Sequence, residues 1–421
     1  MPLEIAIIGS GIAGLVAAIS LGRSNHHVEI YERSAFAGEV GAALNLTPNG
    51  VQVLQKLGFD FERARAVQVM NWDTVNGVNL KRIVCQDLSA AKDMFGAPFF
   101  AVHRVDLHTE LMRLANVSQV QGPSVQHQGT GIPLHLSSPV ARVDAAAGRI
   151  EFVDGTVKHA DLIVGADGVR SVVRSAVVGQ EQQAELLPTG QGAFRFLVST
   201  QELHATPAGR ELLEWKTPGA CMLADPMIED KERHIMWYPC RNGSVQNFVG
   251  IHPYTESSDL LGDPLERMIH QFGHYDEKLV EILKTAKDTK FWPLFSMKPL
   301  ASWTSGKAVL IGDAAHPMLP FGGQGANQAI EDGGVLGTIL ASVKEPAELE
   351  ERLQLFNSLR VPRASRAQIL SSVRANKEHL VVDRIREYME PGVPLPDSFS
   401  KRILHDSRFD ALGHCAEALR A

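Results

Sequence analysis

The feature that most constrains this chain is an apolar run near its N-terminus that is interrupted by three glycines. Residues 5–8 are apolar, Gly9, Gly11 and Gly14 follow with the spacing G-x-G-x-x-G, and residues 15–19 are again apolar or small. This order predicts a buried strand, a tight turn and a helix. The first glycine permits the turn, the second lets a phosphate approach the backbone, and the third lets helix and strand pack closely. Because a helix N-terminus attracts anions, the segment predicts a phosphate-binding loop.

A membrane span or a secretory signal would also contain an apolar run of this kind. A membrane helix needs about 20 predominantly apolar residues, and here the glycines interrupt the run. A signal peptide needs basic residues before its apolar part, whereas the only charged residue ahead of it is Glu4. With 41 basic and 48 acidic residues the formal net charge is -7, which disfavours nucleic acid as a main partner. We therefore predict a cytoplasmic protein without a membrane span.

An acidic residue follows at the distance that a dinucleotide site requires. HHVEIYER (26–33) reads as a strand that ends in Glu32, 23 residues after Gly9. A carboxylate about 20 residues beyond the glycine loop accepts hydrogen bonds from ribose hydroxyls. Glycines before an alanine-rich helix can serve packing alone. The order of strand, glycines, helix, strand and acid nevertheless predicts a dinucleotide site.

Two later segments each place an aspartate and a glycine at the end of a buried strand. They are LIVGADG (162–168), with Asp167, and AVLIGD (308–313), with Asp313. The glycine admits a ligand closely, and the acid can bind its hydroxyl groups. After the second segment, GGQG (322–325) opens a helix whose N-terminus would hold electron-rich oxygens. Either segment alone could be an ordinary turn with aspartate as a cap.

With these segments the chain resembles the single-component class A flavoprotein monooxygenases, the group of p-hydroxybenzoate hydroxylase and salicylate hydroxylase. The resemblance covers nearly the whole chain and rests on GSGIAG with Glu32, GADGVRS, and GDAAHPMLPFGGQGANQAIEDG. AVHRVDLHTEL matches the family segment with an FAD-contacting arginine, here Arg104, and WYPCRNG favours the salicylate hydroxylase-like branch. The implied fold is α/β with an α+β second domain: a Rossmann-like FAD-binding domain, an inserted antiparallel-sheet substrate domain and a C-terminal helical region.

The resemblance implies a set of cofactor contacts. Gly9, Gly11 and Gly14 would line the pyrophosphate, and Glu32 would hold the adenosine ribose. Arg104 would reach the phosphate or ribityl region, and Asp313 would bind the ribityl chain. The backbone of Gly325, Ala326 and Asn327 would meet the pyrimidine edge of the flavin. Further predicted cofactor contacts are Ile12, Ala13, Arg33, Gly41 and Ala42. Asp167 would help to shape the site where FAD and NAD(P)H pass, and Pro317 would face the substrate at the flavin edge.

The implied activity is insertion of one atom of O2 into a small aromatic or polycyclic substrate through a flavin C4a-hydroperoxide. The reaction would be a hydroxylation, an oxidative decarboxylation or an epoxidation. The resemblance implies that FAD is bound non-covalently and that NADH or NADPH binds transiently. The lack of a second G-x-G-x-x-G for a separate nicotinamide domain fits this.

The middle of the chain predicts the sheet that would cover the flavin. QGAFRFLVST, RHIMWYPCRN and SVQNFVGIHP alternate with period two, which is typical of an antiparallel sheet with one covered face. The alternation does not tell which face meets the flavin. The predicted catalytic residues are Pro317, Tyr238 and Arg195, and the predicted substrate contacts are Phe194, Trp215, Met236, His252 and Phe291. Each could instead have a purely structural role: an arginine can pair with a carboxylate, an aromatic ring can belong to the core, and a histidine can simply be hydrogen-bonded.

The predicted domain boundaries are discontinuous. The FAD-binding domain takes residues 1–78, 98–185 and 286–350, the substrate domain takes 79–97 and 186–285, and the helical region takes 351–421. In residues 344–380 we predict two long helices broken at Pro362. The protein would be a monomer or a homodimer.

Two other classes of function remain open at this point. Cys85, Cys221, Cys240 and Cys415 are isolated, so no redox cysteine pair and no metal site are predicted. Another flavin oxidoreductase, an oxidase or a halogenase, would share the fold, although WYPCRNG does not match the W-x-W-x-I-P expected of a halogenase. A non-catalytic binder of the GDP-dissociation-inhibitor kind would also share the fold, but it would have no need of Asp167 and Asp313.

Overall fold

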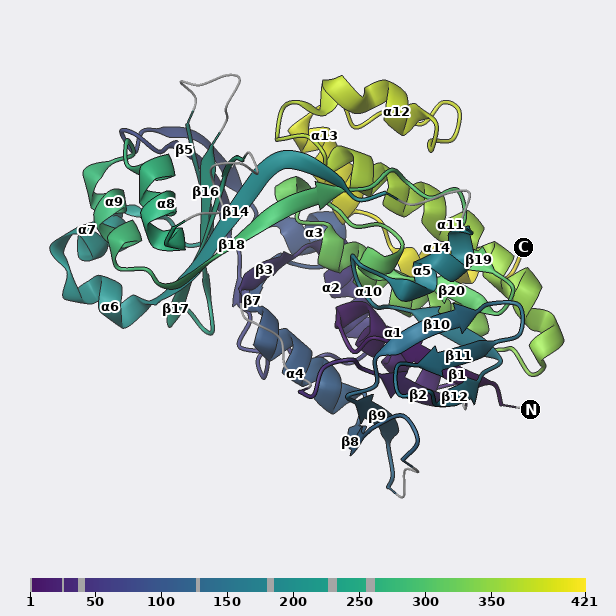
Figure 1. The fold of residues 1–421 in the computed structure, drawn as a ribbon. Helices are drawn as coiled ribbons and strands as arrows, with labels where there is room; N and C mark the ends of the chain where they lie inside the picture. Colours follow the sequence, from purple (N-terminus) through teal and green to yellow (C-terminus); the bar gives the residue numbers. More distant parts are fainter. Residues whose placement is uncertain are drawn as a thin grey trace.

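A mostly parallel sheet forms the centre of the larger of two bodies, which contains both chain termini (Figure 1). In the computed structural model, which describes residues 2–24, 26–36, 42–125, 129–179, 185–225, 233–254 and 262–421, its strand order is β19-β20-β13-β1-β2-β9-β8. The strands are β1 (Glu4–Ile8), β2 (His27–Tyr31), β8 (Val117–Gln121), β9 (Ile132–Leu136), β13 (Leu162–Gly165), β19 (Thr304–Ser305) and β20 (Ala308–Leu310).

The three predicted glycine loops leave this sheet at one edge. β20, β13 and β1 are neighbours and run parallel, so their carboxyl ends lie side by side. Apart from the exposed Glu4 at the start of β1, these strands are apolar and buried in the sheet. Ligands of open parallel sheets bind beyond the carboxyl ends of the strands, and this edge is therefore the place to look for a cofactor site.

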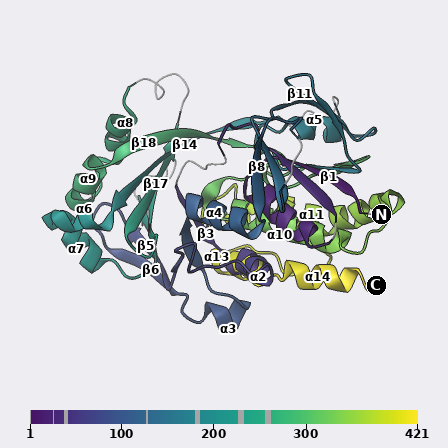
Figure 2. The same ribbon diagram turned by 90° about the horizontal axis from the view of Figure 1, so that it is seen from below.

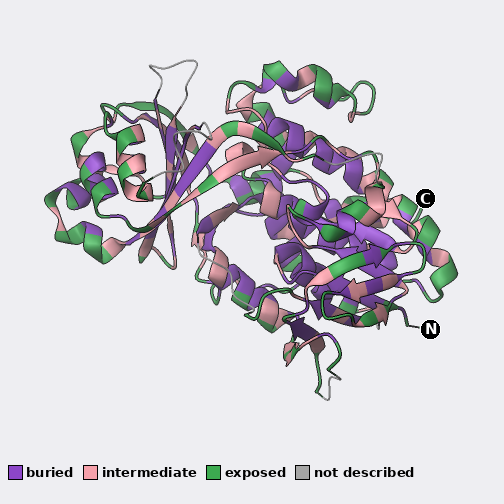
Figure 3. Ribbon diagram, viewed as in Figure 1, coloured by how far each residue is buried: buried purple, intermediate pink, exposed green. Residues whose placement is uncertain are grey.

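Two helices of this body pack against each other at very short range. They are α1 (Ile12–Gly22) and α10 (Gly325–Leu340). A Cβ atom added at Gly333 would lie 2.7 Å from the backbone nitrogen of Ala17, and one at Gly337 would lie 2.1 Å from the Cβ of Ser20. Both helices are largely buried (Figure 3). Since the two contacts advance along both helices in the same direction, α1 and α10 run parallel, with their N-termini at the same end.

A second sheet forms the other body, in the order β18-β14-β17-β16-β15-β5-β6. Its strands are β5 (Asn71–Asn76), β6 (Arg82–Asp87), β14 (Leu187–Ser199), β15 (Ala220–Ala224), β16 (His234–Cys240), β17 (Val245–Pro253) and β18 (Lys287–Ser296). Neighbouring strands are antiparallel except β5 and β15. The long strands β14 and β18 extend from this sheet over the larger body (Figure 1).

The two faces of the second sheet have different partners. Helices cover one face, namely α6 (Thr200–Ala205), α7 (Pro207–Trp215), α8 (Pro264–Phe272) and α9 (Glu277–Lys284). Phe196, Trp237 and Phe248 form an apolar core with these helices. The opposite face carries Met236 and Tyr238 and turns toward the larger body. The alternation left open which face of this sheet meets the flavin. The face that turns toward the larger body is the one with Tyr238.

A small sheet in the order β3-β7-β4 joins the two bodies. Its strands are β3 (Ala43–Leu46), β4 (Val67–Gln68) and β7 (Phe100–His103). The hydroxyl of Tyr238 donates to the carbonyl of Ala43 at 2.8 Å, and the backbone N–H of Ala43 donates to Oδ1 of Asn247 at 3.0 Å. All three residues are buried, and the two hydrogen bonds fasten the backbone of β3 directly to the second sheet.

The C-terminal part of the chain packs on the larger body. It contains α11 (Leu349–Leu370), α12 (Val382–Arg386), α13 (Phe399–Ser407) and α14 (Ala411–Ala418), and α13 and α14 lie beside α2 (Pro48–Lys56) when the molecule is seen from below (Figure 2). The predicted break at Pro362 is wrong, because α11 runs through it as one helix. Pro362 removes one N–H donor, but the affected carbonyl belongs to Ser358, which is exposed and open to water.

The second sheet takes in more of the chain than the predicted segments 79–97 and 186–285. It also contains β5 and β18, which the prediction assigned to the other domain. β5 is mostly polar and β18 carries several charges, so neither stands out as a sheet strand in the sequence. Across the described parts of the chain, no helix is long and apolar enough to cross a membrane.

Candidate active site

The glycine loop after β1 has the close contacts that its spacing predicts. Gly9 has φ +105°, and its N–H donates to the carbonyl of Tyr31 at 2.8 Å. A Cβ at Gly14 would lie 2.0 Å from the Gly9 carbonyl oxygen, so this position admits only glycine. A Cβ at Gly11, in contrast, would meet nothing within 4 Å. The open space in front of Gly11 is where the sequence predicts the pyrophosphate.

Glu32 lies beside this loop at the end of β2. Its Oε2 accepts hydrogen bonds at 3.0 Å from both the backbone N–H and the hydroxyl of Ser10. On the other side of the loop, Nε2 of His108 bonds the Ser10 carbonyl at 2.8 Å. His108 comes from α4 (Arg104–Leu114) and was not a predicted site residue, because nothing in the local spacing connects it with the glycines. Of the other predicted cofactor contacts near this loop, Arg33, which follows Glu32, is exposed. Ile12 and Ala13 are buried in the first turn of α1.

Asp167, at the end of β13, contacts the start of α5 (Val172–Val178). Its carboxylate accepts hydrogen bonds from the Ser171 hydroxyl at 2.5 Å and from the Val172 N–H at 2.6 Å. This is the capping contact that the sequence left open as an alternative. In the structure Asp167 therefore organises the turn beside the predicted cofactor site.

Asp313 lies at the end of β20, in the 3₁₀ turn η1 (Gly312–Ala314). Its side chain is exposed, and desolvation by the surrounding protein raises the pKa of its carboxyl. Arg174 of α5 fixes the turn by donating to the carbonyls of Asp313 at 3.3 Å and Ala314 at 2.9 Å. The buried Arg174 thus ties the second glycine segment to the third, a role that the sequence did not reveal.

The N-terminus of α10 is open at the same edge. Gly323 precedes it with φ +62°, and a Cβ at Gly323 or at Gly325 would meet nothing within 4 Å. Asn327 fixes the first turn: its Oδ1 accepts from the Thr47 N–H at 3.0 Å, and its Nδ2 donates to the Gly323 carbonyl at 2.7 Å. Ala326, between these residues, is half-buried.

Neither α1 nor α10 has a side-chain cap or an acidic residue in its first turn. Their N–H groups and positive dipole ends therefore face open space, which suits the phosphates and the electron-rich ring edge of FAD. The open space before Gly11, the exposed acid Asp313 and the two helix ends all fit this cofactor. The predicted contact Gly41 lies outside the described residues, whereas Ala42 accepts the backbone N–H of Arg104 at 3.0 Å.

Arg195 of β14 lies on the sheet face that turns toward this edge. Burial lowers the pKa of Arg195, and the positive charge of Arg104 lowers it further, while Tyr238 acts in the opposite direction. Within the described part of the chain, Nε of Arg195 is buried without a hydrogen-bond partner. Its guanidinium lies 5.3 Å from the ring centre of Trp292. A half-buried arginine whose buried Nε has an unused donor is suited to bind an anion.

Met236 and residues from two other parts of the chain form a wall on this face of the sheet. Pro317 is buried, and its carbonyl accepts from Nε2 of Gln368 at 3.1 Å. Met236 packs with Phe321, which comes from the loop after Pro317. Arg374 donates to Nδ1 of His234 and lies 4.9 Å from the ring of Phe321. The wall is thus made by the second sheet, the loop before α10 and the C-terminal part together.

Four predicted substrate contacts lie on the opposite face of the sheet: Phe194, Trp215, His252 and Phe291. Phe194 stacks on His252 with ring centres 4.7 Å apart and lies 5.1 Å from Phe291. These residues belong to the core beneath α7–α9. Because the sheet separates them from Arg195 and Tyr238, their placement does not support contact with a substrate at the predicted flavin edge.

The comparisons with known proteins agree with this geometry. The family described as FAD binding domain matches residues 2–370. FAD-dependent monooxygenase cfoG of Aspergillus candidus is 33% identical over 426 residues, which cover 99% of this chain and 95% of that protein. Hispidin-3-hydroxylase of Neonothopanus nambi is 33% identical over 380 residues, 86% of each chain. The chain belongs to the FAD-dependent aromatic monooxygenases.

A solved structure supports the fold of this monooxygenase over its full length. A salicylate hydroxylase substrate complex superposes with a TM-score of 0.72 at 25% identity, covering 99% of this chain and 98% of that one. The predicted fold class and the predicted family are confirmed. The relatives are named as monooxygenases or hydroxylases, so the alternative of a non-catalytic binder has no support from them.

Gly11→Val tests the position of the FAD phosphates. A side chain at Gly11 meets no protein atom, so we expect the melting temperature of the chain without FAD to stay nearly unchanged. FAD affinity should fall by about 100-fold or more, because the side chain occupies the space before the helix N-terminus. The measurement is a titration with FAD followed by its fluorescence. Gly14→Ala is the contrast, since it should destabilise the chain even without FAD. A Gly11→Val protein that binds FAD normally would contradict the assignment.

Phe194→Ala tests the placement of Phe194 in the core. Removing this fully buried ring should lower the free energy of unfolding by about 3–5 kcal/mol. The Michaelis constant for the substrate should stay within about twofold, a difference of less than 1 kcal/mol. Chemical unfolding and steady-state kinetics measure the two effects. A large change in the Michaelis constant with little loss of stability would return Phe194 to the substrate site.

Proposed function

We propose that this monooxygenase hydroxylates a small aromatic or polycyclic substrate that carries an acidic group. Non-covalent FAD, O2, and NADH or NADPH would be the other participants. The observation that carries the proposal is Arg195, whose buried Nε has no partner among the described residues and whose sheet face turns toward the predicted flavin edge. The name of one structural neighbour fits such a substrate, because salicylate is an aromatic acid, and the name hispidin-3-hydroxylase fits the hydroxylation itself.

Bound FAD supplies the redox chemistry, which is hydride acceptance from NAD(P)H and activation of O2. The residues of this chain would bind FAD, orient the substrate and exclude water. Asp313 can accept hydrogen bonds from the ribityl hydroxyls, because its side chain is exposed. The N-terminus of α10 can stabilise negative charge on the pyrimidine edge of the flavin, because no acid in its first turn opposes that charge.

On the substrate side, Arg195 would hold the acidic group and Tyr238 would orient a hydroxyl. Burial raises the pKa of Tyr238 above its usual range, so the phenol stays protonated at neutral pH. Its hydrogen is donated to the Ala43 carbonyl, which leaves the oxygen as an acceptor for a substrate hydroxyl. Met236 and Phe321 would form the apolar wall that excludes water.

The experiment that tests this function follows the flavin spectrum of the purified protein without oxygen. NADH and NADPH are added in turn with a panel of phenolic acids, together with the matched phenols that lack the acid. We expect one acidic compound to accelerate bleaching of the flavin and to gain one oxygen atom, seen by mass spectrometry, when O2 is admitted. Hydrogen peroxide as the only product with every compound would contradict the proposal. The same titration decides between NADH and NADPH.

Arg195→Ala tests the recognition of the acidic group. We expect the Michaelis constant for the acidic substrate to rise by about 10- to 100-fold, which is the strength of a hydrogen bond to a charged group. The matched phenol should be affected much less. Arg195→Lys should retain part of the affinity, because the charge remains while the planar donor is lost.

Arg210→Ala is the control for this prediction, because Arg210 is exposed on α7, behind the sheet. Steady-state kinetics on the three variants measure the effect. Equal losses for the acid and the phenol would remove Arg195 from substrate recognition while leaving the hydroxylase activity in place. The monomeric or dimeric state and the cytoplasmic location stay predictions from the sequence.

A further inference from the structure

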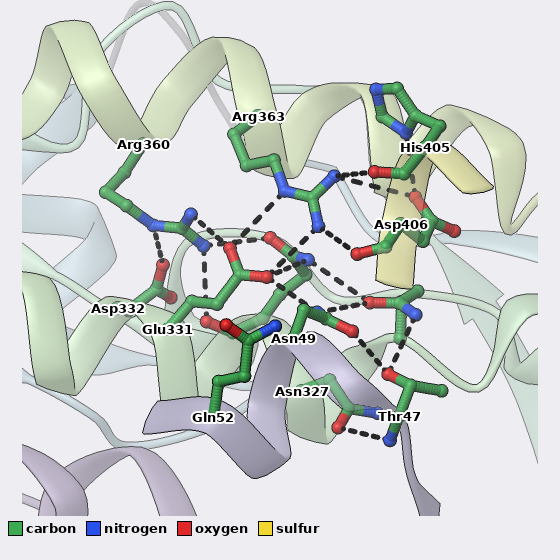
Figure 4. Close-up of polar contacts among 12 residues, drawn as sticks. Thr47, Asn49, Gln52, Asn327, Glu331, Asp332, Arg360, Arg363, His405 and Asp406 are labelled. Carbon is green, nitrogen blue, oxygen red and sulfur yellow. Dashed lines mark hydrogen bonds and ion pairs between the residues drawn. The ribbon is translucent and has the colours of Figure 1, made fainter. Parts of the chain in front are cut away.

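Two adjacent carboxylates in the middle of α10 form the centre of a buried ionic cluster (Figure 4). Glu331 and Asp332 have no exposed surface, and Arg360 and Arg363 of α11 are about as deeply buried. Arg360 bonds both acids: its Nε lies 2.8 Å from Oδ1 of Asp332, and its Nη1 lies 2.5 Å from Oε2 of Glu331. Burying four ionised groups costs free energy unless each finds partners. The other contacts of the two acids show where these partners lie.

Asp332 holds the loop that carries Asp313 and Pro317. Its Oδ2 accepts the backbone N–H of Gly312 at 2.8 Å and Nε2–H of His316 at 2.6 Å. Gly312 directly precedes Asp313, and His316 directly precedes Pro317. One carboxylate oxygen therefore fastens both ends of the segment that the proposed function places along the ribityl chain and the flavin edge. Proximity to His316 and Arg360 lowers the pKa of Asp332 against the opposing effect of burial, so it remains an acceptor.

Glu331 holds the other loop, the one at the N-terminus of α10. Its Oε1 accepts Nδ2 of Asn49 at 2.6 Å, and the same Nδ2 lies 3.1 Å from Oε1 of Gln324. Gln324 in turn donates to the Thr47 hydroxyl at 3.1 Å, and Thr47 donates to Oδ1 of Asn49 at 2.6 Å. This closed ring of hydrogen bonds fixes Gln324, the residue before the first turn of α10.

The cluster is anchored away from both loops. Nη2 of Arg363 donates to Oε1 of Glu331 at 3.1 Å and to the backbone carbonyl of Asp406 at 2.8 Å. Asp406 lies on α13. The two loops that would contact the flavin are therefore held by neighbouring side chains of one helix, and these are held by α11 and α13.

We propose that Glu331 and Asp332 are positioning residues that set the Asp313–Pro317 loop and the N-terminus of α10 against the flavin ring as one unit. The inference rests on the proposed function for the placement of the ring and the ribityl chain. It predicts that a change at Asp332 weakens the flavin half of the FAD site and leaves the adenosine half, formed by the Gly9 loop and Glu32, unchanged.

The test compares FAD with ADP as probes of the full-length chain stripped of flavin. In Asp332→Asn the amide cannot accept from Gly312, His316 and Arg360 together. We expect the FAD dissociation constant to rise by about 10- to 100-fold, as is typical for the loss of an outer partner of a binding site. The ADP dissociation constant should stay within about twofold, or less than 1 kcal/mol. The visible absorption band and the midpoint potential of bound FAD should also shift.

Two further variants keep this test decisive. His316→Phe releases the Pro317 end of the loop from Asp332 but leaves the bonds of Asp332 to Gly312 and Arg360. It should therefore reproduce part of the effect if Asp332→Asn does not fold. Asp73→Asn is the matched control, because Asp73 is equally buried and pairs with Arg82 and the Thr217 hydroxyl in the second sheet. It should lower the melting temperature without changing the spectrum or the potential of bound FAD.

The outcomes separate the inference from the proposed function. Equal loss of FAD and ADP affinity in the Asp332 and His316 variants, or an unchanged FAD site, would overturn the inference, since the cluster would then serve stability alone. Neither result would affect hydroxylation by the wild-type protein. A wild-type protein that binds FAD but hydroxylates none of the phenolic acids would contradict the proposed function and leave the comparison of FAD with ADP intact.

Discussion

The parallel packing of α1 and α10 is the constraint on which the rest of the larger body depends. The glycines of α10 let the two helices approach to the range of backbone contact, and this brings two positive dipole ends to the same edge of the sheet. Two like ends repel each other, and neither first turn contains an acid to offset them. In the proposed site, the phosphates of FAD at one end and the electron-rich ring edge at the other would supply the missing negative charge. Cofactor binding would then be part of the electrostatic balance of the fold.

The second sheet completes the site by presenting one face only. Its helix-covered face is packed with aromatic rings, whereas the face toward the larger body carries Arg195 and the buried Tyr238. In the proposed site, the wall would also include Phe321 and Arg374, from the loop before α10 and from the C-terminal part. Substrate recognition would then be shared among parts of the chain that are far apart in sequence, while FAD recognition would depend mainly on loops at one sheet edge.

This difference accounts for how much could be predicted from the sequence. The glycine loop and the strands before Asp167 and Asp313 were predictable, because each is a local pattern imposed by short contacts. Alternation in the middle strands predicted two faces of the sheet, but it did not tell which one the helices cover, and so Phe194, His252 and Phe291 were grouped with Met236. The bond between Asn49 and Glu331 joins α2 to α10 and leaves no local trace. The continuous helix through Pro362 depends on an exposed carbonyl, which sequence spacing does not reveal.

The two hydrogen bonds of Ala43 limit how the molecule can move. Its carbonyl accepts from Tyr238 and its N–H donates to Asn247, and all three residues are buried. Swinging the second sheet away from β3 would break both bonds at once and leave four polar groups without partners in an apolar setting. Rigid-body opening of the two bodies is therefore costly at this junction. Entry of substrate and release of product would instead require motion of segments that these two hydrogen bonds do not hold.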